Sequence, residues 1–239
     1  NQIASLTTTQ IGALTTDEVA HLTTAQIVAL STGQVASLNS DQIQALSTTQ
    51  VGAIETVDLA SLTTAQIQAL TTDQIRLGLS TTQIVALTTA EVAALTSQQI
   101  QSGLTTDQLV ALSTEQVSSL TTAQVVVFST AQIGVIETRD IAALTSNQIA
   151  ALTTSQIRQG LSTAQLTALG TTQIQALTTE QIQSGLSTDQ IPVLTTNQIA
   201  SLTTTQIGAL TTEEVAHLTT AQIVALSTGQ VASLNSDQI

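Results

Sequence analysis

Two histidines, His21 and His217, are the side chains in this sequence best suited to proton transfer or zinc binding. They occupy the same position in two copies of a longer repeat, where most other copies of the short repeat carry alanine or serine. No second histidine lies near either one, and the chain has no cysteine. Because a zinc site needs three or four converging ligands, we expect both histidines to be surface residues and not metal ligands.

Two acidic pairs also recur, Glu55 with Asp58 and Glu137 with Asp140. Neither pair has the alternating oxygen-ligand spacing of a calcium-binding loop. The favoured interpretation is altered helix capping with solvated charge. A weak calcium site, or a contact between these acids and an arginine of a neighbouring coil, is kept as an alternative.

Serine and threonine are abundant, but no general base is placed beside any of them to activate a hydroxyl. The sequence also has no glycine-rich phosphate loop and no nucleophile motif. We therefore predict no catalytic, cofactor-binding or metal-binding residues, and we expect that the protein is not an enzyme.

An eight-residue repeat positions every one of these side chains. Its consensus is Leu, Thr or Ser, Thr or Ser, any residue, Gln or Glu, Ile or Val, any residue, and Ala or Ser, numbered here as positions 1 to 8. The repeat runs through the chain without a linker, as in Leu22-Thr23-Thr24-Ala25-Gln26-Ile27-Val28-Ala29. Four repeats carry one extra residue and end in glycine: Gly78, Gly103, Gly160 and Gly185.

Longer periods are superimposed on this octad. Residues 1–43 recur at 197–239 with one change, Asp17 to Glu213, which defines a block of 196 residues. Features inside the block, such as Gly78 and Gly160, recur at an offset of 82. The sequence therefore predicts that residues 1–239 form a single continuous tandem array, and we expect it to be a fragment of a longer chain.

Each repeat reads as the start of a short helix. Threonine at position 2 and glutamine at position 5 form a capping box, while the apolar side chains at positions 1 and 6 form a hydrophobic staple. The extra glycines are expected to end their helices in the left-handed conformation. Pro192, at position 7, predicts a helix that is almost complete by then or is locally weak.

One continuous helix is disfavoured, because eight residues rotate each repeat by about 80° relative to the last and the leucines would spiral around the rod. The sequence instead predicts an all-α solenoid of short helical turns, with Leu and Ile or Val inside. Turns this short are stable only when they stack on one another. A β-solenoid remains the alternative, since Thr, Ile and Val favour strands.

Composition excludes several classes of partner. The chain has three basic residues, 16 acidic residues and a net charge of −13, which disfavours nucleic acids and anionic membranes. The longest apolar run, Val125 to Phe128, is far below the roughly 20 residues of a membrane span. No nucleic-acid binding and no membrane insertion are therefore expected.

The stretch from Leu22 to Ser31 resembles the opening helix of transcription activator-like effector repeats, and that resemblance implies a helix beginning here. The long two-helix repeat, the base-reading pair and the lysines of that family are missing, so DNA binding is not implied. As a whole, the chain resembles octapeptide repeat regions of giant secreted or surface proteins of Gram-negative bacteria. That resemblance implies a fibre-like or adhesin-like role.

The expected function is therefore mechanical: a secreted or cell-surface fibre, stalk or adhesive filament that self-associates. Two alternatives remain open. One is an ice-binding or carbohydrate-binding surface made by ranks of exposed threonines, and the other is a repeat scaffold that docks a protein partner.

Overall fold

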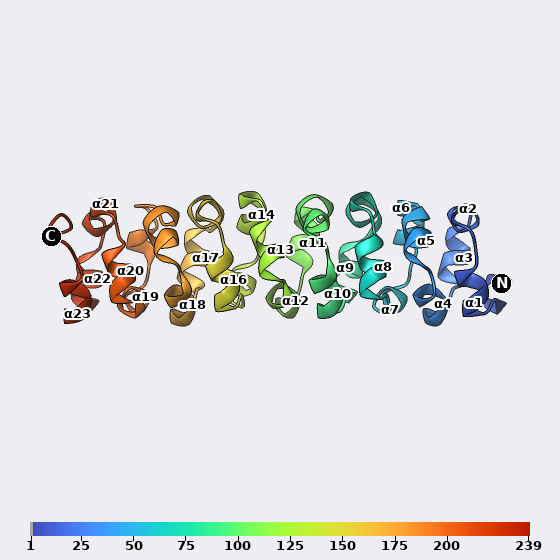
Figure 1. The fold of residues 1–239 in the computed structure, drawn as a ribbon, viewed down its shortest axis with the longest axis horizontal. Helices are drawn as coiled ribbons and strands as arrows, with labels where there is room; N and C mark the ends of the chain where they lie inside the picture. Colours follow the sequence, from blue (N-terminus) through green and yellow to red (C-terminus); the bar gives the residue numbers. More distant parts are fainter. Residues whose placement is uncertain (1) are drawn as a thin grey trace. The chain divides into compact units, whose positions relative to one another are not determined.

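A computed structural model describes residues 2–239 and builds them from short helical segments, one in nearly every repeat (Figure 1). No strand occurs in that range. The chain divides into two compact units, Asn1–Leu120 and Thr121–Ile239, and each is described by itself. The prediction of an all-α solenoid of short helical turns is confirmed, and the β-solenoid alternative is wrong.

The helical segments of the first unit are short and evenly spaced. They are η1 (Ile3–Ser5), α1 (Thr8–Gly12), α2 (Thr16–Ala20), α3 (Thr24–Val28), α4 (Thr32–Ala36), α5 (Ser40–Ala45), α6 (Thr48–Gly52), α7 (Thr56–Leu59), α8 (Thr64–Ala69), η2 (Gln74–Gly78), α9 (Thr81–Ala86), α10 (Thr89–Ala94), η3 (Gln99–Gly103), α11 (Thr106–Ala111) and α12 (Thr114–Ser119).

The second unit is built in the same way. Its segments are α13 (Thr122–Val126), α14 (Thr130–Val135), α15 (Thr138–Ile141), α16 (Ser146–Ala151), η4 (Gln156–Gly160), α17 (Thr163–Ala168), α18 (Thr171–Ala176), η5 (Gln181–Gly185), η6 (Ile191–Val193), α19 (Thr196–Ser201), α20 (Thr204–Gly208), α21 (Thr212–Ala216), α22 (Thr220–Ala225) and α23 (Thr228–Ala232).

Helix α8 illustrates how a repeat starts and stops. Thr63 lies before it in an extended conformation, and its hydroxyl accepts a hydrogen bond from the backbone N–H of Gln66 at 3.3 Å. The Gln66 side chain accepts from the Thr63 N–H at 2.8 Å, which completes the predicted capping box. Leu70 then takes φ −57° and ψ 131°, which ends the helix and turns the chain toward the next cap.

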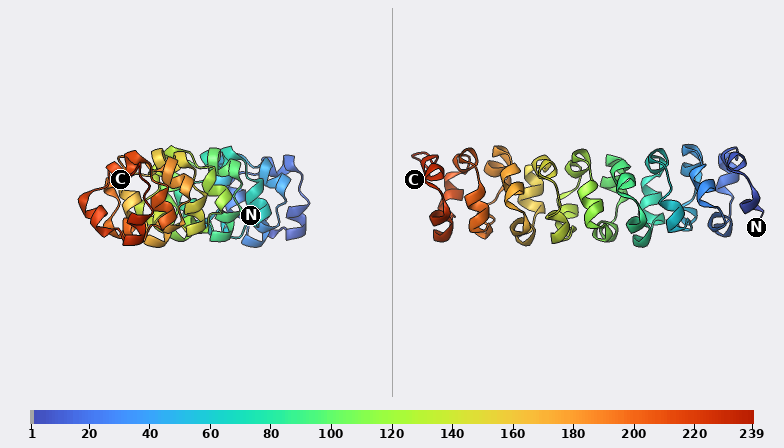
Figure 2. Two further views of the ribbon diagram at one scale, coloured as in Figure 1. Left: turned by 60° about the vertical axis from the view of Figure 1, so that its left-hand side comes forward. Right: turned by 90° about the horizontal axis from the view of Figure 1, so that it is seen from below.

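Each turn of the solenoid, called a coil below, contains three repeats. Helices pack against the helix three segments later, as α2 does on α5 and α5 on α8 in the first unit, and α13 on α16 in the second. The first residues of α2 and α5 are 24 apart, so an octad-only coil has 24 residues. Figure 2 shows successive coils stacked within each unit.

The interior is a ladder of aliphatic side chains from positions 6 and 1. In α8, Ile67 has no exposed surface and Leu70 only 3%. Burying each such side chain stabilises the fold by about 1.5–3 kcal/mol. The predicted placement of Leu and Ile or Val inside is therefore correct for most repeats, with Ile223 and Val231 as exposed exceptions, and in the second unit the single aromatic, Phe128, takes a buried leucine position.

The extra glycines do not end helices as expected. No glycine in the described part of the chain has a positive φ. Each nine-residue repeat instead forms a π-helical turn, in which the N–H of Leu79, for example, donates to the carbonyl of Gln74 at 3.1 Å. The left-handed glycine prediction is wrong because the inserted residue is absorbed inside the helix and not after it.

Close packing explains the glycine at the end of two of the four π-turns, those of Gly78 and Gly160. A Cβ on Gly78 would lie 2.8 Å from the carbonyl oxygen of Thr48 in the preceding coil, and a Cβ on Gly52 would lie 2.9 Å from the Gly78 oxygen. In the second unit, a Cβ on Gly160 would lie 3.1 Å from Ile133 side-chain atoms. At these positions the bulge presses the backbone against the previous coil, whereas a Cβ on Gly103 or Gly185 would meet its nearest neighbours at 3.5 and 3.4 Å, which is ordinary contact.

Pro192 weakens its repeat in the predicted way. The segment from Ser187 to Leu194 has no α-helix, only an isolated turn followed by η6. Proline has no N–H to donate to a carbonyl four residues earlier, so a regular α-helix is lost at that point. Gln190 keeps the joint to the preceding coil, since its amide still donates to the Ile157 carbonyl at 2.9 Å.

None of the helices in the described residues has the length and apolar composition needed to cross a lipid bilayer.

Candidate functional site

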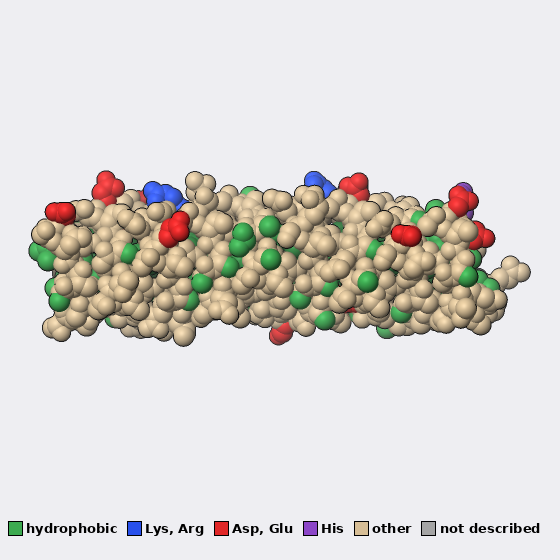
Figure 3. Space-filling model, in the orientation of Figure 1, with side chains coloured by type: hydrophobic (Ala, Val, Ile, Leu, Met, Phe, Trp, Pro, Cys, Tyr) green, Lys and Arg blue, Asp and Glu red, His purple; other side chains and the backbone are tan. Residues whose placement is uncertain are grey.

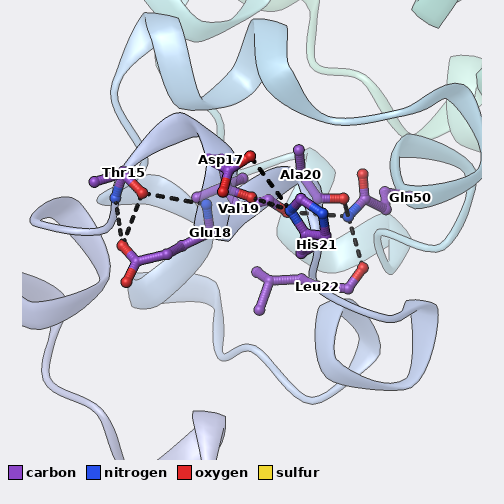
Figure 4. Close-up of polar contacts among 8 residues, drawn as sticks. All are labelled: Thr15, Asp17, Glu18, Val19, Ala20, His21, Leu22 and Gln50. Carbon is purple, nitrogen blue, oxygen red and sulfur yellow. Dashed lines mark hydrogen bonds and ion pairs between the residues drawn. The ribbon is translucent and has the colours of Figure 1, made fainter.

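The most specific chemistry in the structure is a buried side-chain amide at the corner between repeats. The Oε1 atom of Gln50 accepts from the backbone N–H of Ser47 at 2.7 Å, as the capping box requires. Its Nε2 atom donates to the carbonyls of Val19 at 3.0 Å and Leu22 at 2.6 Å, in the preceding coil (Figure 4). One side chain therefore caps its own helix and binds the coil before it.

We call this arrangement a glutamine joint: a position-5 glutamine whose Oε1 accepts from its own cap and whose Nε2 donates to carbonyls 28 to 33 residues earlier. The joints of the first unit include Gln34, Gln42, Gln50, Gln66, Gln74, Gln83, Gln99, Gln108 and Gln116. Those in the second unit include Gln156, Gln165, Gln173, Gln181, Gln190, Gln198, Gln206, Gln222, Gln230 and Gln238.

Sequence reasoning missed this role, because it assigned the glutamine only to the capping box. A signal was available. Glutamate satisfies the capping box as well as glutamine does, yet position 5 carries glutamate at only Glu18, Glu91 and Glu214. The preference for an amide indicates that an N–H donor is needed at this position in addition to the acceptor.

The three glutamates have different environments. Glu18 lies in the first coil and is exposed, and hydrogen bonds from the backbone N–H and hydroxyl of Thr15 lower its pKa. Burial raises the pKa of Glu91 and of Glu214. Near Glu214, the positive charge of Arg158 partly opposes the increase in pKa, and this arginine also donates to the Leu186 carbonyl at 3.1 Å.

The acidic pairs fit one part of the favoured interpretation, since α7 and α15 begin without a side-chain cap or a capping box at Glu55 and Glu137. Asp58 and Asp140 occupy position 5 and are only 4% and 1% exposed, so the prediction of solvated charge is wrong for both. Asp58 accepts from the Thr32 hydroxyl of the preceding coil at 2.7 Å. In the second unit, Arg139 lies 2.9 Å from Glu137 and 3.5 Å from Asp140. This acid–arginine contact lies within one helix and not between coils.

The histidines lie where the sequence placed them, on the surface. Nδ1 of His21 is 2.7 Å from the Asp17 carbonyl, and Nδ1 of His217 is 2.7 Å from the Glu213 carbonyl, so each ring closes its own helix end. The side chain of His21 is 77% exposed (Figure 4). Among the residues the structure covers, no three His, Asp or Glu side chains are grouped so as to hold a metal ion.

The remaining surface is shallow and mostly uncharged. A hollow of about 360 Å³ in the second unit is lined by small and polar residues, including Thr153, Thr178 and Glu180. On the face drawn in Figure 3, both units expose mainly neutral polar groups, with separate acidic side chains and small apolar patches. The drawn face therefore offers many similar polar contacts.

Comparison with known proteins places the chain among repeat proteins. No curated protein matches the sequence. A solved structure, the leucine-rich repeat-containing protein LegL7 from Legionella pneumophila, is 12% identical over 88% of this chain and 78% of LegL7, with a TM-score of 0.21. That score is too low to support an argument about fold or function.

A family model gives the decisive match. The ALTTAQ repeat model matches eight consecutive segments, residues 1–24, 19–53, 51–89, 102–135, 133–159, 159–184, 184–212 and 212–239. These segments cover all but residues 90–101, and their tandem order agrees with the helical repeats and joints described above. The chain therefore belongs to the ALTTAQ repeat family.

Proposed function

We propose that this structural repeat scaffold is a non-catalytic fibre, stalk or adhesive filament of the cell surface or extracellular space, and that it self-associates. The observation that carries the proposal is the glutamine joint. Because nearly every coil is bound to the previous one by the same amide contacts, length is gained by adding repeats without new chemistry. A mechanical spacer uses this property, whereas a catalyst needs unlike groups converging at one place.

Surface chemistry supports the same role. A net charge of −13 keeps a repetitive polar surface hydrated and limits indiscriminate aggregation. Against this background, small apolar contacts can decide how copies associate. Val85 on α9 and Val110 on α11 are 51% and 37% exposed, and these two helices pack directly against each other in successive coils. They form a small apolar stripe suited to a lateral contact with a second copy.

Sedimentation velocity over a range of concentrations, with electron microscopy of the same samples, tests self-association. We expect the chain to form concentration-dependent filaments, and we expect the double variant Val85→Asp and Val110→Asp to form fewer of them. The matched control is Thr81→Asp with Thr106→Asp, which adds the same charge at exposed first positions of the same two helices, where a negative charge is tolerated. Dispersed monomers at every concentration would contradict the proposal.

A second function is favoured by the exposed position-3 threonines. Position-2 threonines use their hydroxyls in capping, as Thr63 does, whereas Thr64 and Thr89 are exposed on the stacked helices α8 and α10. Ranks of such hydroxyls could contact ice or a carbohydrate. Thermal hysteresis and glycan binding, measured for the chain and for a Thr64→Tyr and Thr89→Tyr variant, distinguish this role, since a spacer shows neither activity.

A further inference from the structure

One joint in the first unit has a carboxyl group where its neighbours have an amide. Glu91 is 3% exposed, and its Oε2 atom accepts from the Thr88 N–H at 2.6 Å, as in every capping box. Its other oxygen, Oε1, is buried without a hydrogen-bond partner. Leaving a buried polar atom unpaired is unfavourable, and the cost is greater for a charged one.

The register of the neighbouring joints shows what Oε1 faces. Gln83 donates to the carbonyls of residues 32 and 29 positions earlier, Val51 and Ile54. Gln99 uses the same offsets to reach Ile67 and Leu70. The same offsets place the carbonyls of Leu59 and Leu62 opposite Glu91. An ionised carboxylate has no hydrogen to donate to them, so oxygen atoms with partial or full negative charge face one another.

No basic side chain on the surrounding helices compensates this charge. Helix α10 packs against α8, which has no charged residue, and against α12, which carries only Glu115. The carbonyls opposite lie at the end of α7 (Leu59) and just after it (Leu62), and the titratable residue of α7 is Asp58. Every ionisable group on these elements is therefore acidic, and a proton on Glu91 is the simplest means of pairing Oε1.

We propose that Glu91 is a proton-dependent joint: when protonated, its carboxyl O–H donates to a carbonyl of the preceding coil, and when ionised it loosens that contact. The proton is taken from solvent and released to it, and no other bond is made or broken. Acidification then tightens the joint at α10, whereas the joints made by Gln83 and Gln99 are insensitive to pH.

The direction of the pH effect follows from burial. Desolvation raises the pKa of Glu91 above the ordinary value of 4.5, and the hydrogen bonds from Thr88 only partly oppose it. A group whose pKa is higher in the folded state stabilises the fold below its unfolded pKa. That stability is lost as the pH rises through the folded value. The contribution of Glu91 is therefore complete below about pH 4.5 and is lost at higher pH.

Carbon-13 NMR of the glutamate carboxyls tests the proposal directly, because the chain has eight glutamates. The Glu91 resonance, assigned by its loss in Glu91→Gln, is expected to titrate at a higher pH in the folded chain than in the urea-unfolded chain. Glu91→Gln restores the consensus amide, so this variant folds. It is expected to have a higher urea midpoint than the parent chain at pH 7 and an unchanged midpoint near pH 4.

Two further variants isolate the joint. Gln83→Glu should create a second pH-sensitive joint, with a urea midpoint lowered at pH 7 and recovered in acid. Asp107→Asn removes an exposed carboxylate from the same unit. This control should leave the difference between the urea midpoints at pH 7 and near pH 4 unchanged. The proposal is overturned if Glu91 titrates at the same pH in the folded chain as in the urea-unfolded chain, or if Glu91→Gln keeps the pH dependence of the parent chain.

Discussion

At the scale of single residues, the position-5 glutamine combines two functions that proteins usually assign to different groups. Its oxygen satisfies a backbone N–H at the helix start, and its nitrogen satisfies carbonyls of the preceding coil, as Gln66 does for Val35 at 2.9 Å and Leu38 at 2.8 Å. These carbonyls lie in the interior, where an unpaired polar atom costs about 1–3 kcal/mol. Glutamine is the shortest uncharged side chain that supplies both contacts at this reach.

Replacing Gln50 by alanine tests this energetic role. The change leaves the carbonyls of Val19 and Leu22 without their amide donor and removes the acceptor for the Ser47 N–H. We expect the free energy of unfolding in urea to fall by about 3 kcal/mol. Gln44→Ala is the control, because Gln44 is an exposed position-7 residue in a neighbouring repeat, and its loss should change stability by less than about 0.5 kcal/mol. Equal effects of the two substitutions would show that burial of the amide has no energetic role.

The residue types alone predicted one of the two contacts of the glutamine joint, the capping box, but not the contact with the preceding coil. The spacing of Thr63 and Gln66 was sufficient for the capping box, because both partners lie within one helical turn. The second contact joins atoms about 30 residues apart, and its partners are backbone carbonyls, which are the same for every residue type. Only the number of repeats per coil determines which carbonyls are reached, and the octad sequence does not specify that number.

At the scale of the helix, segments of five or six residues are too short to be stable alone. Each therefore depends on its cap as well as on stacking. Thr63→Ala removes the hydroxyl that accepts from the Gln66 N–H, and we expect a loss of about 1 kcal/mol in the free energy of unfolding.

Thr64→Ala is the matched control for that cap. Thr64 is the next residue, exposed at the first position of α8, and its replacement should change stability by less than about 0.5 kcal/mol. Guanidinium denaturation followed by circular dichroism measures both variants. A larger loss for Thr64→Ala than for Thr63→Ala would reverse the assignment of the capping residue.

The π-turns give a second prediction for helices. Gly78→Ala brings a methyl group within 2.8 Å of the Thr48 carbonyl oxygen, and backbone on both sides has little freedom to move. We expect a loss of about 1–3 kcal/mol, typical of overpacking.

Gly33→Ala is the control for Gly78→Ala, because it makes the same substitution where there is space for a methyl group. Its Cβ would meet only the Thr8 methyl at 3.8 Å, inside helix α4, where alanine is favoured over glycine by about 1 kcal/mol. Thermal unfolding should therefore show a lower melting temperature for Gly78→Ala and an unchanged or higher one for Gly33→Ala. Similar shifts in the same direction would indicate that close coil packing does not explain the glycine.

The residues at which helices begin could be predicted from the sequence. Whether the extra residue of a nine-residue repeat lies within the helix or after it could not. A cap is encoded by neighbouring residues such as Ser80 and Gln83. An inserted glycine, in contrast, can be placed after the helix or within it, with similar local energies. Contact with the preceding coil decides between these outcomes, as the short approach of Gly52 to the Gly78 oxygen illustrates. The sequence contained the glycine and the site of insertion, but not the neighbour that fixes the geometry.

At the scale of the whole molecule, the array is modular because equivalent joints recur every eight or nine residues. Exceptions lie at defined repeats: the buried carboxyl groups of Asp58 and Glu91 in the first unit and of Asp140 and Glu214 in the second, the π-turns and Pro192. Uniformity explains why fold class was readable from sequence while function was not. A regular array specifies how coils stack, but the same stack of coils is compatible with a spacer, a filament or a row of ligand-binding side chains.

Modularity makes a prediction about insertions. Duplicating the repeat Leu22–Ala29 after Ala29 shifts the joints of Gln34, Gln42 and Gln50 by one whole repeat, so each amide meets equivalent carbonyls. We expect the free energy of unfolding to change little. The helical circular dichroism signal should increase in proportion to the number of residues in the chain. Duplicating only Thr24–Ile27 adds half a repeat at the same place. It moves those three amides out of register, at a cost of about 1–3 kcal/mol for each buried group left unpaired. Urea unfolding of the two insertion variants separates the cases: equal destabilisation by eight and by four residues would mean that register between coils, and hence the glutamine joint, does not hold the array together.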